Sequence, residues 1–313
     1  MTGIYKIVDS VNNLLWGKNI LVFMLIGAAL YFSFKTKFMQ FRLFHKIVKV
    51  LFKNEKDKHK HGISSLETFF LGTACRVGAG NIAGVVAAIS VGGAGSIFWM
   101  WLVAMLGSAT AFIESSLAVI YRKKEKDGSY TGGTPFIIEK RLNMRWLGII
   151  YALASVICYF GVTQVMSNSI TGSITSVYTW GANNKFFNLQ NISSIAVAIL
   201  VAYIIFFSKS KKDSIIASLN KIVPFMAIIY VVAVIYILVT NLTTIPAMIG
   251  NIFSQAFGTK EVLGGTFGAV VMNGVRRGLF SNEAGSGNSN YAAAAVHIDI
   301  PAKQGMVQAF GVF

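Results

Sequence analysis

Long apolar stretches alternate along the chain with short polar or basic connections. Because a helix needs about 20 mainly apolar residues to cross a bilayer, the pattern predicts seven membrane-spanning helices and the beginning of an eighth. We therefore expect one all-α, polytopic membrane domain over residues 1–313 that is incomplete at its C-terminal end. The predicted spans are residues 14–34, 66–91, 96–121, 147–178, 192–207, 222–240 and 262–280, and the last apolar run is 306–313.

The connection between the first two spans is unusually basic. Residues 35–60 hold nine Lys or Arg residues around spaced Phe, Leu, Ile and Val residues. This pattern is typical of an amphipathic helix at the membrane surface, and a solvated basic loop is the alternative interpretation. Residues 243–257 predict a connection on the other side of the membrane that contains a short helix.

Composition and charge support a membrane protein. Only 13% of the residues are charged, about half the share in soluble domains. The net charge of +16 would suggest nucleic acid in a soluble protein, but the basic residues gather in the connections 35–60, 122–145, 209–221 and 276–303. We expect no nucleic-acid partner. The positive-inside rule instead places these connections in the cytoplasm of a cell (inner) membrane protein, with the N-terminus outside.

The second predicted span is interrupted near its middle by small residues. Gly78, Ala79 and Gly80 are followed at once by Asn81. Paired glycines weaken a helix, and an opened helix would offer free N–H groups to an anion and free carbonyls, with the Asn81 amide oxygen, to a small cation. Close packing of two helices through small residues is an equally good interpretation.

Ionisable and polar groups also occur within the predicted spans. Arg76 and Glu114 would be costly in lipid and are expected to face a cavity or each other, in a functional or a structural role. Gln164 and Asn168 predict either a polar pocket wall or hydrogen bonds between helices. No nucleophile, base and orienting group can be assembled, and the His residues lie in basic or polar connections, so we expect neither an enzyme nor a metal centre.

The last predicted span is also interrupted by glycines. Gly264, Gly265 and Thr266 precede Asn273, and a second glycine-broken span favours a binding site near the membrane midplane. The polar segment 281–290 that follows must line a cavity or gate if it lies at membrane depth. A capped cytoplasmic loop is the alternative.

Two motifs carry a resemblance to a known family. Residues 77–81 and 278–285 resemble the alanine or glycine:cation symporter family, as do the segments 8–17, 38–42, 92–101 and 132–135. The resemblance implies sodium- or proton-coupled transport of alanine or glycine by alternating access. It also implies a leucine-transporter-like inverted repeat with an extra N-terminal helix. The spans 66–91 and 262–280 would be its two broken helices.

The resemblance implies roles for particular residues. Backbone N–H groups at the first break would bind the substrate carboxylate, and the second break and the polar groups of the fourth span would line the same pocket. The implied substrate-binding residues are Gly78, Ala79, Gly80, Gln164, Asn168, Gly264, Gly265 and Thr266, and Asn81 would help to hold the cation. From their positions in the predicted spans and in the polar segment after them, Arg76 and Asn273 are further candidates for the cation, and Glu114, Asn282, Glu283 and Gly285 are candidates for a structural or gating role. No cofactor is implied beyond the coupling ion.

The chain also departs from the family's pattern. Ala79 stands where many members have Thr or Ser, and Arg76 stands where some have Thr, which leaves the cation stoichiometry open. When the chain is aligned with the family at Asn168, the family's Gln falls on Met166. Gln164 lies two positions earlier, on a different face of the helix. The expected later spans are absent, so a truncated, non-transporting fragment is the alternative function. The choice of sodium or proton, of alanine or glycine, and the oligomeric state stay open.

Overall fold

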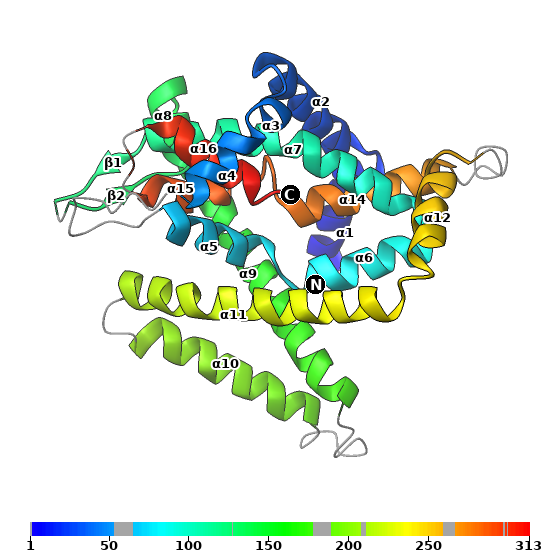
Figure 1. Ribbon diagram of the computed structural model, residues 1–313. Coiled ribbons are helices and arrows are strands. Elements are labelled where there is room, and N and C mark those ends of the chain that lie inside the picture. The colour runs from blue at the N-terminus through cyan, green and yellow to red at the C-terminus, as the bar shows by residue number, and fades with distance from the viewer. Residues whose placement is uncertain are drawn as a thin grey trace.

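The computed structural model describes residues 2–52, 65–126, 128–177, 189–207, 211–258, 267–296, 298 and 300–313 (Figure 1). These residues are almost entirely helical, which confirms the predicted all-α class. A small antiparallel hairpin pairs β1 (Lys123–Lys124) with β2 (Tyr130–Thr131). The helices are α1 (Thr2–Asn12), the π-helical turn η1 (Asn13–Gly17), α2 (Ile20–Lys35), α3 (Met39–Arg42), α4 (Phe44–Phe52), α5 (Ser65–Arg76), α6 (Ala79–Gly92), α7 (Gly95–Ile120), α8 (Thr134–Leu142), α9 (Arg145–Val177), α10 (Leu189–Phe207), α11 (Lys211–Thr240), α12 (Ile245–Phe257), α14 (Phe267–Asn282), α15 (Ser289–Ala295) and α16 (Pro301–Phe310).

Helix α7 is the centre of the packing. It contacts α2, α6, α12, α14, α15 and α16, and the residues Gly107, Ser108, Ala109, Thr110 and Ala111 are all buried. Such small residues let neighbouring helices approach closely where apolar burial in lipid supplies little driving force. Figure 1 shows the result: α14, α15 and α16, from the end of the chain, lie beside elements from its beginning.

Several helices present apolar side chains outward. Within the described residues, the segments 95–120, 145–175 and 221–240 are long and apolar enough to cross a membrane, and the bent pair 5–17 and 20–35 would form a fourth span. The apolar windows of the second and third are 0% and 6% buried, so their side chains are placed to face lipid. The protein is therefore a membrane protein, and the count of seven spans stays a prediction.

The first predicted span begins with a bend that is held by α14. Asn19 takes the left-handed conformation (φ 58°) between η1 and α2. Arg276 donates through Nε to Asn19 Oδ1 (3.1 Å) and through Nη2 to the Trp16 carbonyl (2.8 Å). The prediction that places Arg276 in the basic connection 276–303 is corrected here. Arg276 is inside α14, and its long side chain satisfies its donors within the protein.

The helix expected at the membrane surface over residues 35–60 is instead two short helices, α3 and α4. Ile47 and Leu51 of α4 are 0% and 4% exposed, and α4 packs against α5 and α16. Its apolar face therefore packs on protein, and the position of this part at the membrane surface stays a prediction. Residues 53–64 lie outside the described residues. The short helix expected within 243–257 is confirmed as α12.

The final apolar run also differs from the prediction. It belongs to α16, which begins at Pro301 rather than at residue 306 and is followed by a turn after Phe310. Five of the ten residues of α16 are buried, and the helix packs against α7, α4 and α5. The Phe310 ring lies 6.3 Å from the Phe44 ring and 5.8 Å from the Phe69 ring, so α16 ties the end of the described chain to α4 and α5.

Candidate functional site

The second predicted span is broken at the glycine pair, as expected. α5 ends at Arg76, α6 begins at Ala79, and Gly78 between them is extended (φ −134°, ψ −178°). Asn81 donates its N–H back to the Gly78 carbonyl (3.0 Å), and no side chain caps α6. The first N–H groups of a helix have no partner within it. The break therefore presents backbone donors at the start of α6.

Met166 of α9 covers the break. A Cβ added to Gly78 would lie 2.7 Å from Met166 Cε, so only a glycine fits without movement of that side chain. Residues two positions apart on a helix point about 200° apart. Gln164 and Asn168 therefore face away from the break, and both are exposed. The structure does not bring these two predicted pocket residues to the break. The residue that does reach the break is Met166, which aligns with the Gln of the family.

Helix α14 packs on α6 in the opposite direction. Gly92, at the end of α6, lies against Asn273, and Gly84 lies against Arg277. Asn273 is therefore near the far end of α6, about 16 Å along the helix from Asn81, and its amide donates to the Ala269 carbonyl (2.8 Å). The structure does not join Asn273 and Asn81 in one cation site. Instead, the C-terminal end of α14 lies toward the break.

The polar segment after α14 wraps around Glu114. Glu283, Gly285 and Gly287 have φ values of 52°, 87° and 79°, a left-handed series that glycine allows most easily. The turn brings the Gly285 N–H to 3.4 Å and the Ser289 hydroxyl to 3.3 Å from Glu114 Oε1. The interpretation of this segment as part of a buried polar cluster is thereby favoured over a solvated loop.

Asn282, at the end of α14, is 5% exposed and accepts the Ala284 N–H at its Oδ1 (2.9 Å). It also lies against Gly107 of α7, where an added Cβ would be 3.1 Å from Asn282 Nδ2. Asn282 thus anchors the start of the turn to the central helix. This contact supports the structural role expected of it.

Helices α8 and α9 hold the other side of the turn. The Tyr151 hydroxyl donates to the Ser286 carbonyl (2.8 Å), and the Tyr159 hydroxyl donates to Asn288 Oδ1 (3.1 Å). Further along, Asn290 donates to Thr134 Oγ1 (2.9 Å). Sequence analysis missed these partners. The sequence signal that could have indicated them is the spacing of the two tyrosines, which places both on one face of α9. Met166 lies on the same face.

Arg76 joins the break to this cluster. It is 6% exposed, and a Cβ on Gly311 would lie 2.5 Å from its Nη1. Its charge acts on both Glu114 and Glu283. Burial raises the pKa of Glu283, against the opposing effects of the Asn288 amide (3.3 Å) and of Arg76. Arg76 thus acts electrostatically on two carboxyl groups, and its pairing with Glu114 stays a prediction.

The arrangement can bind both signs of charge. Free N–H groups at a helix start and a guanidinium attract an anion, while carbonyl, amide and carboxylate oxygens suit an alkali cation. Among the described residues no group of three His, Cys, Asp or Glu has the arrangement of a metal centre. Gly264, Gly265 and Thr266 lie outside the described residues. For Ala79 and Gly80 the structure describes the helix but not the surroundings of the residues.

Comparison with known proteins places this chain in a family. Residues 1–313 match the profile of the sodium:alanine symporter family. The chain belongs to this family. It is 40% identical over 296 residues to the amino-acid carrier protein AlsT of Bacillus subtilis (strain 168), a match covering 94% of this chain and 60% of AlsT.

Two further relatives differ in their named substrates. The probable sodium/glutamine symporter GlnT of Bacillus subtilis (strain 168) is 39% identical over 306 residues, which cover 98% of this chain and 62% of GlnT. The sodium/alanine symporter AgcS of Methanococcus maripaludis is 35% identical over 314 residues, which cover 98% of this chain and 67% of AgcS. The chain spans about three fifths of the length of AlsT and GlnT.

Proposed function

We propose that the chain takes part in sodium-coupled symport of a small amino acid, alanine or glycine, across the cell membrane. The observation that carries the proposal is the break between α5 and α6 at Gly78, inside a predicted span. Family membership and the names of AgcS and GlnT support sodium and an amino acid as the cargo. Neither distinguishes alanine from glycine or glutamine.

In this proposal the N–H groups of Gly78, Ala79 and Gly80 bind the substrate carboxylate, and Asn81 contributes an oxygen to the sodium ion. Gly264, Gly265 and Thr266 would face them from the second broken helix. Met166 supports a small substrate, because its side chain already lies against the glycine at the break. A larger amino acid would have to displace it.

Arg76 supplies a fixed positive charge beside this site, in the place of a second bound cation. Glu114, Asn282, Glu283 and Gly285 form the gate. The turn around Glu114 holds α14 against α7, α8 and α9 through hydrogen bonds that a shift of α14 would break. Because cation and substrate would stabilise the same closed arrangement, each would increase the affinity for the other by a coupling of about 1–3 kcal/mol.

The test is uptake of labelled alanine into proteoliposomes, with an inward sodium gradient or with choline in its place, and with AlsT reconstituted in parallel. We expect sodium-driven uptake that unlabelled alanine or glycine reduces more strongly than glutamine. Gly78→Ala should lower uptake at least tenfold, and Met166→Ala in the same chain should recover part of it by freeing the space. In Arg76→Ala the sodium dependence should become steeper.

Uptake that is equal in sodium and choline would contradict the proposal. Loss of activity in Gly78→Ala without any recovery in the double variant would contradict the pocket geometry alone. If AlsT is active and this chain is inactive under identical conditions, the non-transporting interpretation is correct. Equal yields and elution profiles of all variants show that folding is not the cause.

A further inference from the structure

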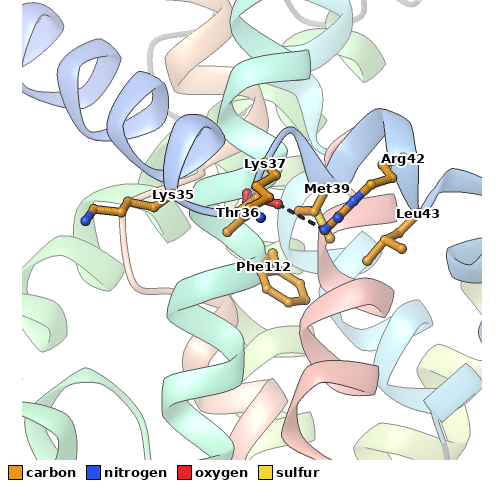
Figure 2. A pocket seen from close by; sticks show the side chains of 7 residues that line it. All are labelled: Lys35, Thr36, Lys37, Met39, Arg42, Leu43 and Phe112. Atoms are coloured by element: carbon orange, nitrogen blue, oxygen red, sulfur yellow. Dashed lines mark hydrogen bonds between the residues drawn. The ribbon is translucent and has the colours of Figure 1, made fainter.

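A second polar site lies where α2 ends, away from the break. Lys37 and Phe38 both take the left-handed conformation (φ 54° and 50°) and turn the chain from α2 into α3. The turn stands over Phe112 of α7 and leaves a cavity of about 380 Å³. Its lining is Lys35, Thr36, Lys37, Met39, Arg42, Leu43 and Phe112 (Figure 2).

The rim of this cavity is cationic. Lys35, Lys37 and Arg42 are exposed, and no acidic residue belongs to the lining. None of the three forms an ion pair within 4.0 Å with a residue that the structure describes. In Figure 2 the Arg42 guanidinium is turned toward the Thr36 carbonyl, to which it donates at 3.4 Å. The Lys35 side chain points away from the other lining residues, and its Nζ lies 5.7 Å from the centre of the Tyr31 ring. Within the described part of the chain, no acidic side chain of the lining compensates the positive charge of the cavity.

The floor and surroundings of the cavity are apolar. Met39 is 1% exposed and Phe112 closes the bottom. Exposed aromatic side chains flank these lining residues along the chain: Tyr31 (56%), Phe34 (65%) and Phe41 (57%). The rings of Phe34 and Phe41 lie 5.1 and 6.5 Å from the ring of Phe38. Aromatic residues and cations together at the end of an apolar helix are typical of the boundary between hydrocarbon and headgroups.

From this juxtaposition we infer that the pocket binds the phosphate group of an anionic phospholipid. Lys35, Lys37 and Arg42 would bind the phosphodiester, and the exposed aromatic rings would contact the acyl chains. Basic pockets between membrane helices are the usual form of such sites. A free anion would account for the cations but not for the aromatic surface next to them. The inference rests on the membrane location of the chain and not on the proposed transport.

The test titrates detergent-solubilised protein with short-chain phosphatidylglycerol, phosphatidylcholine or inorganic phosphate and follows binding by microscale thermophoresis. We expect phosphatidylglycerol to bind at least tenfold more tightly than the other two. One variant changes the three pocket cations to Gln. Since each basic residue near a membrane surface contributes about 1 kcal/mol, it should weaken phosphatidylglycerol binding on the order of 100-fold.

The control variant removes the same charge elsewhere, by Lys46→Gln, Lys49→Gln and Lys124→Gln, all at exposed positions. It should bind phosphatidylglycerol within twofold of the unchanged chain. Equal weakening in both variants would mean general charge attraction and would overturn the inference, as would equal binding of the two lipids. If inorganic phosphate binds as tightly as phosphatidylglycerol, the pocket holds a free anion and the assignment to a lipid is wrong.

Discussion

The closest backbone approach between α14 and the central helix leads to a quantitative prediction for Gly274→Ala. Gly274 is buried, and a Cβ there would meet the Ser96 carbonyl oxygen, lie 2.7 Å from Trp99 Cβ and lie 3.1 Å from Ser96 Cα. Carbon atoms attract best at about 3.5–4.0 Å. Two of these atoms belong to the backbone, so α14 and α7 would have to separate by roughly 1 Å.

That separation would loosen the adjacent core. Val275 and Leu279 of α14 pack against Val103 of α7 and Val22 of α2, and a gap of 0.5–1 Å loses about a quarter to a half of each contact's attraction. Overpacking of a core destabilises a protein by about 1–3 kcal/mol. Replacing a helical glycine by alanine stabilises the helix by at most about 1 kcal/mol. We therefore expect a net destabilisation of about 1–2 kcal/mol.

Thermal unfolding in detergent, followed by size-exclusion chromatography of heated samples, measures this effect. At about 2–4 °C per kcal/mol, the midpoint of Gly274→Ala should fall by about 2–8 °C. Heating rates must be identical because membrane proteins commonly unfold irreversibly. Gly268→Ala is the matched control, because it lies on the same helix and its Cβ would have no neighbour within 4 Å. A midpoint of Gly274→Ala equal to that of Gly268→Ala would refute the packing argument.

Two further predictions concern charged groups of α14 and the turn after it. Arg276→Gln removes donors to the bend before α2, and since a hydrogen bond to a charged group contributes about 1.5–3 kcal/mol, trypsin should cleave after Lys18 on the order of tenfold faster. The exposed neighbour Arg277→Gln should leave this rate unchanged, as judged by mass spectrometry, and equal rates in both variants would disprove the clamp. Burial raises the folded-state pKa of Glu283 above 4.5, so the folded protein binds the proton more tightly and stability falls as pH rises from about 4.5. Glu283→Gln should flatten this fall in the thermal midpoint measured against pH, and an unchanged slope would contradict the burial of the carboxyl group.

The apolar stretches and the glycine pair are local features of the sequence. Sequence analysis therefore predicted the helices that the apolar stretches form and the helix break at the glycine pair. Helices form at each predicted span that the structure describes, because backbone hydrogen bonds must be satisfied within the segment in lipid. The break falls at Gly78, where the helix is weakest. Family membership was likewise predictable from short motifs around the break and after α14.

The tertiary structure decided which side chains meet. Met166 rather than Gln164 reaches the break. The two residues lie on different faces of α9, and the packing of α9 against its neighbours decides which face points toward the break. The antiparallel contact of α14 with α6 separates Asn273 from Asn81 and brings the turn around Glu114 toward Gly78. Charge patterning placed Arg276 in a loop, yet its partners, Trp16 and Asn19, lie more than 250 residues earlier. Local sequence determines where helices begin and break, but contacts between distant segments set their rotation and register.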